Sequence, residues 1–152
     1  MPGVAILTLV IDRISKWVVM TNLRLGESWN PVAALEPYVS LTYVTNTGAA
    51  FGLFPDYGVL FMVIAVVVVV TIIFYYRHLP GDQWLVQISL GLQLGGALGN
   101  LMDRLLYGHV IDFIDFKVWP VFNLADSAIV VGAVILAYHL LRHGGGELEI
   151  RD

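Results

Sequence analysis

The chain has 152 residues, of which 58% are hydrophobic and 13% charged, with a formal net charge of −4 and a mean hydropathy of +0.78. Soluble domains are about one quarter charged, so this chain has too little polar surface to face water all round. The length suits one domain, the scattered Lys and Arg residues indicate no nucleic-acid partner, and the lack of cysteine excludes disulfide and thiol chemistry. We therefore expect a membrane protein.

The first expected element is a membrane helix over residues 1–23, which we expect to be retained rather than removed as a signal peptide. Three charged residues, Asp12, Arg13 and Lys16, lie inside it. At about 2.5–3.5 kcal/mol each, these charges would cancel most of the gain from its apolar residues. Asp12 and Lys16 are four residues apart on one face, so we expect them to form a buried structural pair.

The remaining elements follow two long connections. The connection 24–56 contains the segment Tyr38–Thr45, whose β-branched and aromatic residues predict a short β-rich segment. The uncharged runs 57–76 and 84–102 are each long enough to cross a hydrocarbon layer of about 30 Å. After the connection 103–120, residues 121–141 form the last expected span. The fold class is thus an all-α membrane protein with four spans, both termini on one side and both long connections on the other.

Polar residues near the spans are costly in so apolar a protein, and their positions are therefore informative. They gather at the ends of the spans that adjoin the two long connections. Those of interest are Asn46, Asn100, Asp103, Arg104, Asp112, Asn123 and Asp126. Asn123 and Asp126 are three residues apart and share a helical face. Their convergence predicts one functional site at one face of the membrane.

The chemistry open to this site is narrow. There is no His-Glu-x-x-His motif, so we expect neither a metal nor another cofactor. Ser127 and His139 are too distant to act together, since 12 residues of helix span about 18 Å. Two carboxyl groups held close would share a proton, which lets one activate water while the other polarises a carbonyl group. The plainer interpretation is a set of solvated helix-end carboxylates, with Asp126 capping the last helix.

Two other functions compete with a hydrolase. A small proton-coupled transporter would also use membrane carboxylates, but it is expected to place them near the midplane or in repeated halves. Here the acidic residues lie at one end of the spans. A non-catalytic assembly factor would need no carboxylate pair. We keep the transporter as the alternative.

Five segments, in order, resemble the motif blocks of lipoprotein signal peptidase (signal peptidase II), an aspartic intramembrane peptidase family. They are Asp12–Lys16, Asn46–Gly52, Gly95–Arg104, Val110–Phe113 and Phe122–Ile129. Any one block alone would be weak, but five blocks in the family order are specific. The resemblance implies that Asp112 and Asp126 form the catalytic pair, a choice that the residues alone leave open between Asp112, Asp103 and Asp115.

The resemblance also implies roles for the surrounding residues. Those that hold the substrate or support the pair would be Asn46, Gly48, Asn100, Arg104 and Asn123. Asp103 with Arg104 is expected to be a structural ion pair, although contact with a substrate carbonyl is the open alternative. Asn100 and Asn123 could equally join helices by hydrogen bonds.

The expected substrate is a bacterial prolipoprotein, cut just before its diacylglyceryl-modified cysteine. The resemblance further implies a multi-pass protein of the inner membrane, surrounded by lipid, with its active site near the extracytoplasmic face. Both termini would then be cytoplasmic, and we expect the chain to act as a monomer.

Overall fold

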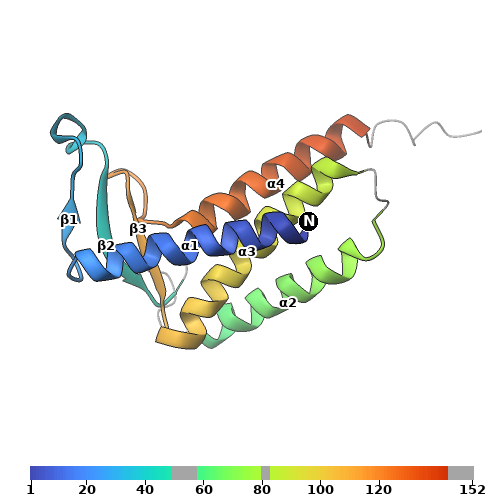
Figure 1. Cartoon of the computed structure of the whole chain (residues 1–152), viewed down its shortest axis with the longest axis horizontal. Coiled ribbons are helices and arrows are strands. Elements are labelled where there is room, and N and C mark those ends of the chain that lie inside the picture. The colour runs from blue at the N-terminus through green and yellow to red at the C-terminus, as the bar shows by residue number, and fades with distance from the viewer. Residues whose placement is uncertain (49–57, 80–82, 144–152) are drawn as a thin grey trace, which may run out of the picture.

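The computed structural model describes residues 1–48, 58–79 and 83–143. The elements of this described part are, in order, α1 (Pro2–Asn22), β1 (Ser28–Trp29), η1 (Ala33–Leu35), β2 (Ser40–Asn46), α2 (Gly58–Tyr76), α3 (Trp84–Tyr107), β3 (Val110–Asp115) and α4 (Leu124–His143). The helices form a bundle, and the sheet lies at one end of it, away from the N-terminus (Figure 1). The motif residues 49–52 and residue 57, where the second span was expected to begin, lie outside the described residues.

Helix α3 is the centre of the bundle, because it packs against α1, α2 and α4. Eleven of its 24 residues are buried, whereas in α2 only Ile72 is. Glycines allow this close packing. A Cβ atom at Gly95 would lie 2.6 Å from the Ala5 carbonyl oxygen in α1, and one at Gly96 would lie 2.4 Å from the Ala125 carbonyl oxygen in α4. Small residues thus let the backbones of α1 and α4 approach α3 on two sides.

The outer surface of the bundle is apolar, as a lipid environment requires. Within the described residues, α2, α3 and α4 are long and apolar enough to cross a membrane. Helix α1 carries three charged residues, but its most exposed large side chains are apolar: Ile6, Leu7, Ile14 and Trp17 are each more than half exposed. Asp12 and Lys16 are fully buried. The chain is therefore a helical membrane protein with three strongly apolar helices.

A three-stranded antiparallel sheet in the order β1-β2-β3 closes the end of the bundle. Strand β2 agrees with the β-rich segment expected between the first two helices, and its Val44 pairs with Asp112 of β3. Strand β3 differs from expectation, because residues 103–120 were predicted to form a connection between two spans. Its first four residues are all buried, so the strand has no alternation of apolar and polar residues that would reveal it.

Two helix boundaries differ from expectation, and both place site residues. Helix α3 continues past residue 102 to Tyr107 and ends at Gly108, whose φ of 76° is left-handed. Asp103 is therefore part of a helix, where its carboxylate finds buried partners. Helix α4 begins at Leu124 rather than at residue 121, because Phe122 is still paired with Ile114 in an antiparallel bridge.

Candidate active site

Strand β3 presents Asp112, which is 2% exposed. Its Oδ1 accepts a hydrogen bond of 2.7 Å from Asn123 Nδ2, and its Oδ2 accepts one of 3.0 Å from Asn46 Nδ2 on β2. The Asn46 side chain is itself held, because its Oδ1 accepts from the Gly48 backbone N–H at 3.0 Å. Both carboxyl oxygens of Asp112 are thus fixed by amide groups from two different elements.

The surroundings of Asp112 favour its protonated form. Burial is the main cause, and the nearby charge of Asp126 adds to it, so that the pKa of Asp112 rises from 3.8 to about 6. The hydrogen bonds from Asn46 and Asn123, followed by the positive charge of Lys16, act in the opposite direction and lower this pKa. Asp112 therefore binds a proton more readily than an ordinary aspartate.

Asp126 lies in the first turn of α4, which Asn123 caps. The Asp126 backbone N–H donates to Asn123 Oδ1 at 2.9 Å, and the Asn123 N–H faces Asp126 Oδ2 at 3.4 Å. This reciprocal arrangement is a capping box. The other carboxyl oxygen, Oδ1, accepts a bond of 2.7 Å from Asn100 Nδ2 on α3. Position and partners together suit a carboxylate, because a helix N-terminus attracts negative charge.

The two asparagines connect the two aspartates. Asn123 Nδ2, which donates to Asp112, also donates to Asn100 Oδ1 at 3.0 Å. Because a lysine ammonium can only donate, its approach fixes the amide orientation of Asn100: Lys16 Nζ lies 3.0 Å from Oδ1, which leaves Nδ2 facing Asp126. A continuous series of hydrogen bonds therefore runs from Asp112 through Asn123 and Asn100 to Asp126.

Both carboxyl groups open on one cavity of about 320 Å³. Its polar lining also includes Asn46, Asn100 and Arg104, while Phe61, Trp119 and Phe122 are among the apolar residues that complete the wall. The Arg104 guanidinium stands 5.9 Å above the Phe61 ring, and its Nη1 is 3.5 Å from the Asn100 carbonyl oxygen, at the limit of a hydrogen bond. Arg104 can therefore offer donors to a bound ligand. A larger groove of about 370 Å³ between α1, α2 and α3 contains none of these polar residues.

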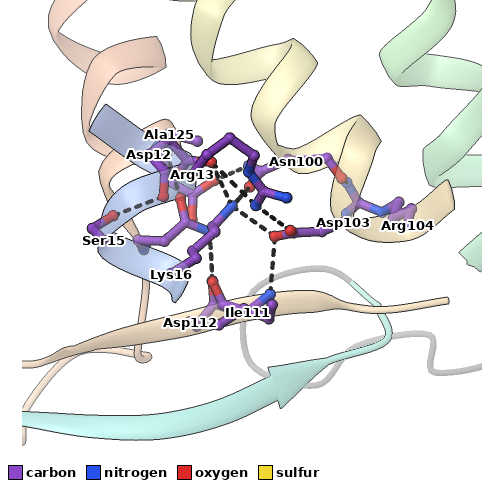
Figure 2. Close-up of polar contacts among 12 residues, drawn as sticks. Asp12, Arg13, Ser15, Lys16, Asn100, Asp103, Arg104, Ile111, Asp112 and Ala125 are labelled. Atoms are coloured by element: carbon purple, nitrogen blue, oxygen red, sulfur yellow. Dashed lines mark hydrogen bonds and ion pairs between the residues drawn. The ribbon is translucent and has the colours of Figure 1, made fainter. Parts of the chain in front are cut away.

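Behind the aspartate pair lies a buried charge cluster, drawn in Figure 2. It contains Asp12, Lys16 and Asp103, which are fully buried, and Arg13, whose side chain is 21% exposed. Lys16 Nζ is 3.0 Å from Asp12 Oδ2 and 2.6 Å from Asp103 Oδ2, and Arg13 also pairs with Asp103. Asp103 thus pairs with cations of α1 instead of its neighbour Arg104, and it does not line the cavity. This geometry favours a structural role for Asp103 over substrate contact.

The ion pair between Arg13 and Asp103 was not predicted from the sequence, where Arg13 was considered only as a cost of membrane insertion. The spacing offered a signal, because Arg13 and Lys16 are three residues apart and reach the same side of α1. Phe61 and Trp119 in the cavity wall were not predicted either. Within the described residues, no group of three or more histidine or acidic side chains is placed to hold a metal ion.

Comparisons with known proteins agree with this architecture. The family model for signal peptidase (SPase) II matches residues 4–142. Lipoprotein signal peptidases of Moorella thermoacetica and Halothermothrix orenii are 48% and 44% identical to the chain; they cover 93% and 90% of it and 92% of their own lengths. Two bacterial membrane enzymes solved by the in meso method superpose with TM-scores of 0.84 and 0.79 at 26% and 27% identity. These matches cover 98% and 92% of this chain and 92% and 91% of theirs.

The fold and these relatives define a membrane-embedded peptidase. More specifically, the chain belongs to the lipoprotein signal peptidase (signal peptidase II) family. The alternative of a proton-coupled transporter finds no support among the matches.

Proposed function

We propose that this chain is an aspartic endopeptidase that removes the signal peptide from diacylglyceryl-modified prolipoproteins, cutting just before the lipidated cysteine. The observation that carries the proposal is that Asp112 and Asp126 line one cavity and are joined through Asn123 and Asn100. Two linked carboxyl groups in a partly dry site are suited to sharing one proton.

The proposed reaction uses the two aspartates in different protonation states. Ionised Asp126 takes a proton from a water molecule as the water oxygen attacks the scissile carbonyl carbon, and the proton of Asp112 passes to the carbonyl oxygen. A neutral gem-diol results. When it collapses, the C–N bond breaks, Asp126 gives its proton to the leaving nitrogen and Asp112 recovers one from a diol hydroxyl. The raised pKa of Asp112, about 6, supports its role as the protonated member.

Substitution of each aspartate tests the proposal. Asp112→Asn and Asp126→Asn should each lower kcat for a diacylated precursor by at least about 10³-fold, because neither asparagine can exchange a proton. Asp115→Asn is a matched control: Asp115 lies on the same strand but outside the cavity, where it binds Lys117 at 2.7 Å. Full cleavage by either of the first two variants would exclude the aspartate-pair mechanism.

The apolar part of the cavity wall, which includes Phe61, Trp119 and Phe122, supports a substrate that carries a lipid. Acyl chains that contact such a wall would supply binding energy remote from the reacting bond. A precursor with unmodified cysteine should therefore be cut with a kcat/KM at least about tenfold lower than the diacylated form. Equal turnover of the two precursors would show that the lipid is not recognised.

We also propose that α1 is a fourth span in a single-domain monomer. Its 21 residues measure about 31 Å, close to the thickness of a hydrocarbon layer. Of its charged residues, Asp12 and Lys16 are fully buried, and Arg13 is 21% exposed and pairs with Asp103. The sheet and the cavity would then face the outside of the inner membrane, with both termini in the cytoplasm. Fusion of alkaline phosphatase after His143 should give an inactive reporter, whereas a green fluorescent protein fused there should fluoresce. The reverse result would overturn this topology.

A further inference from the structure

The buried charge cluster is connected to the backbone on either side of the cavity. Asp12 Oδ1 accepts a hydrogen bond of 3.2 Å from the N–H of Ala125, the residue directly before Asp126. Asp103 Oδ2 accepts one of 3.2 Å from the N–H of Ile111, the residue directly before Asp112. Each carboxylate of the cluster therefore holds the backbone that carries one aspartate of the pair.

Lys16 joins these two connections. Its ammonium group has three N–H donors, and three acceptors surround it: Asp12 Oδ2 at 3.0 Å, Asp103 Oδ2 at 2.6 Å and Asn100 Oδ1 at 3.0 Å. The Lys16 side chain is fully buried. Figure 2 shows Lys16 on helix α1, near Asn100 and Asp103 of α3 and facing strand β3. The third acceptor matters most, because it orients the Asn100 amide toward Asp126.

We propose that Lys16 is a positioning residue for catalysis, which sets the placement of both aspartates through Asp12, Asp103 and Asn100. This inference rests on the proposed function, since it assigns Lys16 a part in the same reaction. Lys16 does not line the cavity and has no contact with the space that substrate would fill. Besides its positive charge, which lowers the pKa of Asp112, Lys16 acts through geometry. A displacement of about 1 Å at reacting groups can cost about 10²-fold in rate.

A plainer role would be to balance charge and hold α1 against α3. Arg13 separates the two roles, because it belongs to the same cluster and pairs with the same carboxylates, Asp12 and Asp103. It is a partner in charge balance but is not among the residues bound to Asn100. Arg13 is 21% exposed and Lys16 fully buried, but each contributes one positive charge to the cluster. If charge balance were the whole role of Lys16, loss of Arg13 would lower kcat by a comparable factor.

The first comparison is therefore Lys16→Met against Arg13→Met in the full chain, each assayed on the diacylated precursor. Both variants remove one cation from the cluster. Lys16→Met should lower kcat by about 100-fold with KM within about threefold of wild type, whereas Arg13→Met should lower kcat by less than about tenfold. Equal losses in kcat, or wild-type kcat in Lys16→Met, would overturn the proposal. Unfolding followed by the fluorescence of the four tryptophans reports whether each variant is folded.

Lys16→Met alone could prevent folding, because it leaves a buried carboxylate without its cation, which is strongly destabilising. A second variant with balanced charge keeps the proposal testable in that case. Lys16→Met/Asp12→Asn removes one charge of each sign and leaves the Arg13–Asp103 pair in place. The amide oxygen of Asn at position 12 can still accept from Ala125 N–H. Positioning predicts that kcat stays about 100-fold low in this variant. Recovery to within about threefold of wild type would show that Lys16 acts by charge balance alone.

A measurement independent of activity distinguishes failure of this inference from failure of the proposed function. Amide hydrogen exchange of the segment 109–126, which carries both aspartates, should be faster in Lys16→Met/Asp12→Asn than in Arg13→Met. The reason is that the acceptors of the Ala125 and Ile111 N–H groups, at positions 12 and 103, are no longer joined by Lys16. If the wild-type chain does not cut the precursor, the proposed function fails, and the exchange comparison still decides the role of Lys16. Equal exchange in the two variants would refute it.

Discussion

Asp112→Asn should make the protein more stable at alkaline pH while abolishing its activity. Burial, and then the charge of Asp126, raise the pKa of Asp112 from 3.8 to about 6. The folded state therefore binds a proton more tightly than the unfolded state does. For such a group the stabilising contribution is fully present below the unfolded pKa and is lost as the pH rises through the folded pKa. Above about pH 6, the wild-type chain carries a charge that its folded state disfavours.

The size of this effect follows from the two pKa values. A rise from 3.8 to about 6 corresponds to about 3 kcal/mol at alkaline pH, with about 1.4 kcal/mol for each tenfold change in proton affinity. Asparagine removes the charge, but it offers one acceptor oxygen where Asp112 offers two, to Asn46 and Asn123. The lost hydrogen bond costs about 1 kcal/mol or slightly more. We expect a net gain of about 1–2 kcal/mol at about pH 8.

The assay is unfolding in detergent micelles, followed by tryptophan fluorescence at about pH 5 and about pH 8. The gain in unfolding free energy should grow by about 1.5 kcal/mol between these two conditions, since the cost of the missing hydrogen bond is nearly independent of pH. Asp115→Asn serves as control and should lose stability, because Asp115 has bonds to Lys117 at 2.7 Å and Thr42 at 2.9 Å to lose. A pH-independent difference between wild type and Asp112→Asn would refute the reasoning.

Three further predictions concern activity and packing. Peptidase activity should decline as the pH rises through about 6, where Asp112 loses its proton, and a flat alkaline profile would contradict this. Asn46→Ala removes a hydrogen bond that lowers the pKa of Asp112, so the alkaline limb should move to higher pH; a move to lower pH would refute the assignment. Gly99→Ala should cost about 1–3 kcal/mol and most of the activity, because its Cβ would lie 2.4 Å from Asp12 Oδ2. Gly3→Ala should be nearly neutral by thermal unfolding and cleavage assay, because its added Cβ would lie more than 4 Å from every atom outside its two neighbouring residues and the adjoining backbone of α1.

The sequence was most informative where one physical force dominates. In lipid, an uncharged run of about 20 residues forms a helix, so the described part of α2, Gly58–Tyr76, lies within the predicted span 57–76 and ends at the predicted residue. The same reasoning gave wrong boundaries at the C-terminal end of α3 and at the N-terminal end of α4. There Asp103 is stabilised by partners on α1, and Phe122 by pairing with Ile114, neither of which local sequence reveals.

The polar residues that line the cavity could be named from the sequence, but the apolar residues of its wall and the hydrogen bonds between the polar ones could not. The positions of the polar residues at one end of the spans predict that Asn100, Asn123 and Asp126 lie together. They do not specify which side chain donates each hydrogen bond and which accepts it. The donor-only ammonium of Lys16 is what decides the orientation of Asn100, and its approach depends on the tertiary packing of α1 against α3. Strand β3 was hidden for a similar reason, since burial on both faces removes the alternation that marks a strand.

The charges of α1 are best understood through this packing. Taken alone, Asp12, Arg13 and Lys16 oppose insertion of the helix into lipid by about 2.5–3.5 kcal/mol each. In the folded chain they meet Asp103, and the cluster then contains two cations and two anions with no net charge. Uncharged side chains could join the helices at least as firmly, because replacing a buried ion network with apolar residues is often neutral or stabilising. Charged groups, however, accept and donate hydrogen bonds in directions that apolar groups cannot. That directional capacity is used at Ala125, Ile111 and Asn100, the three points that hold the aspartate pair.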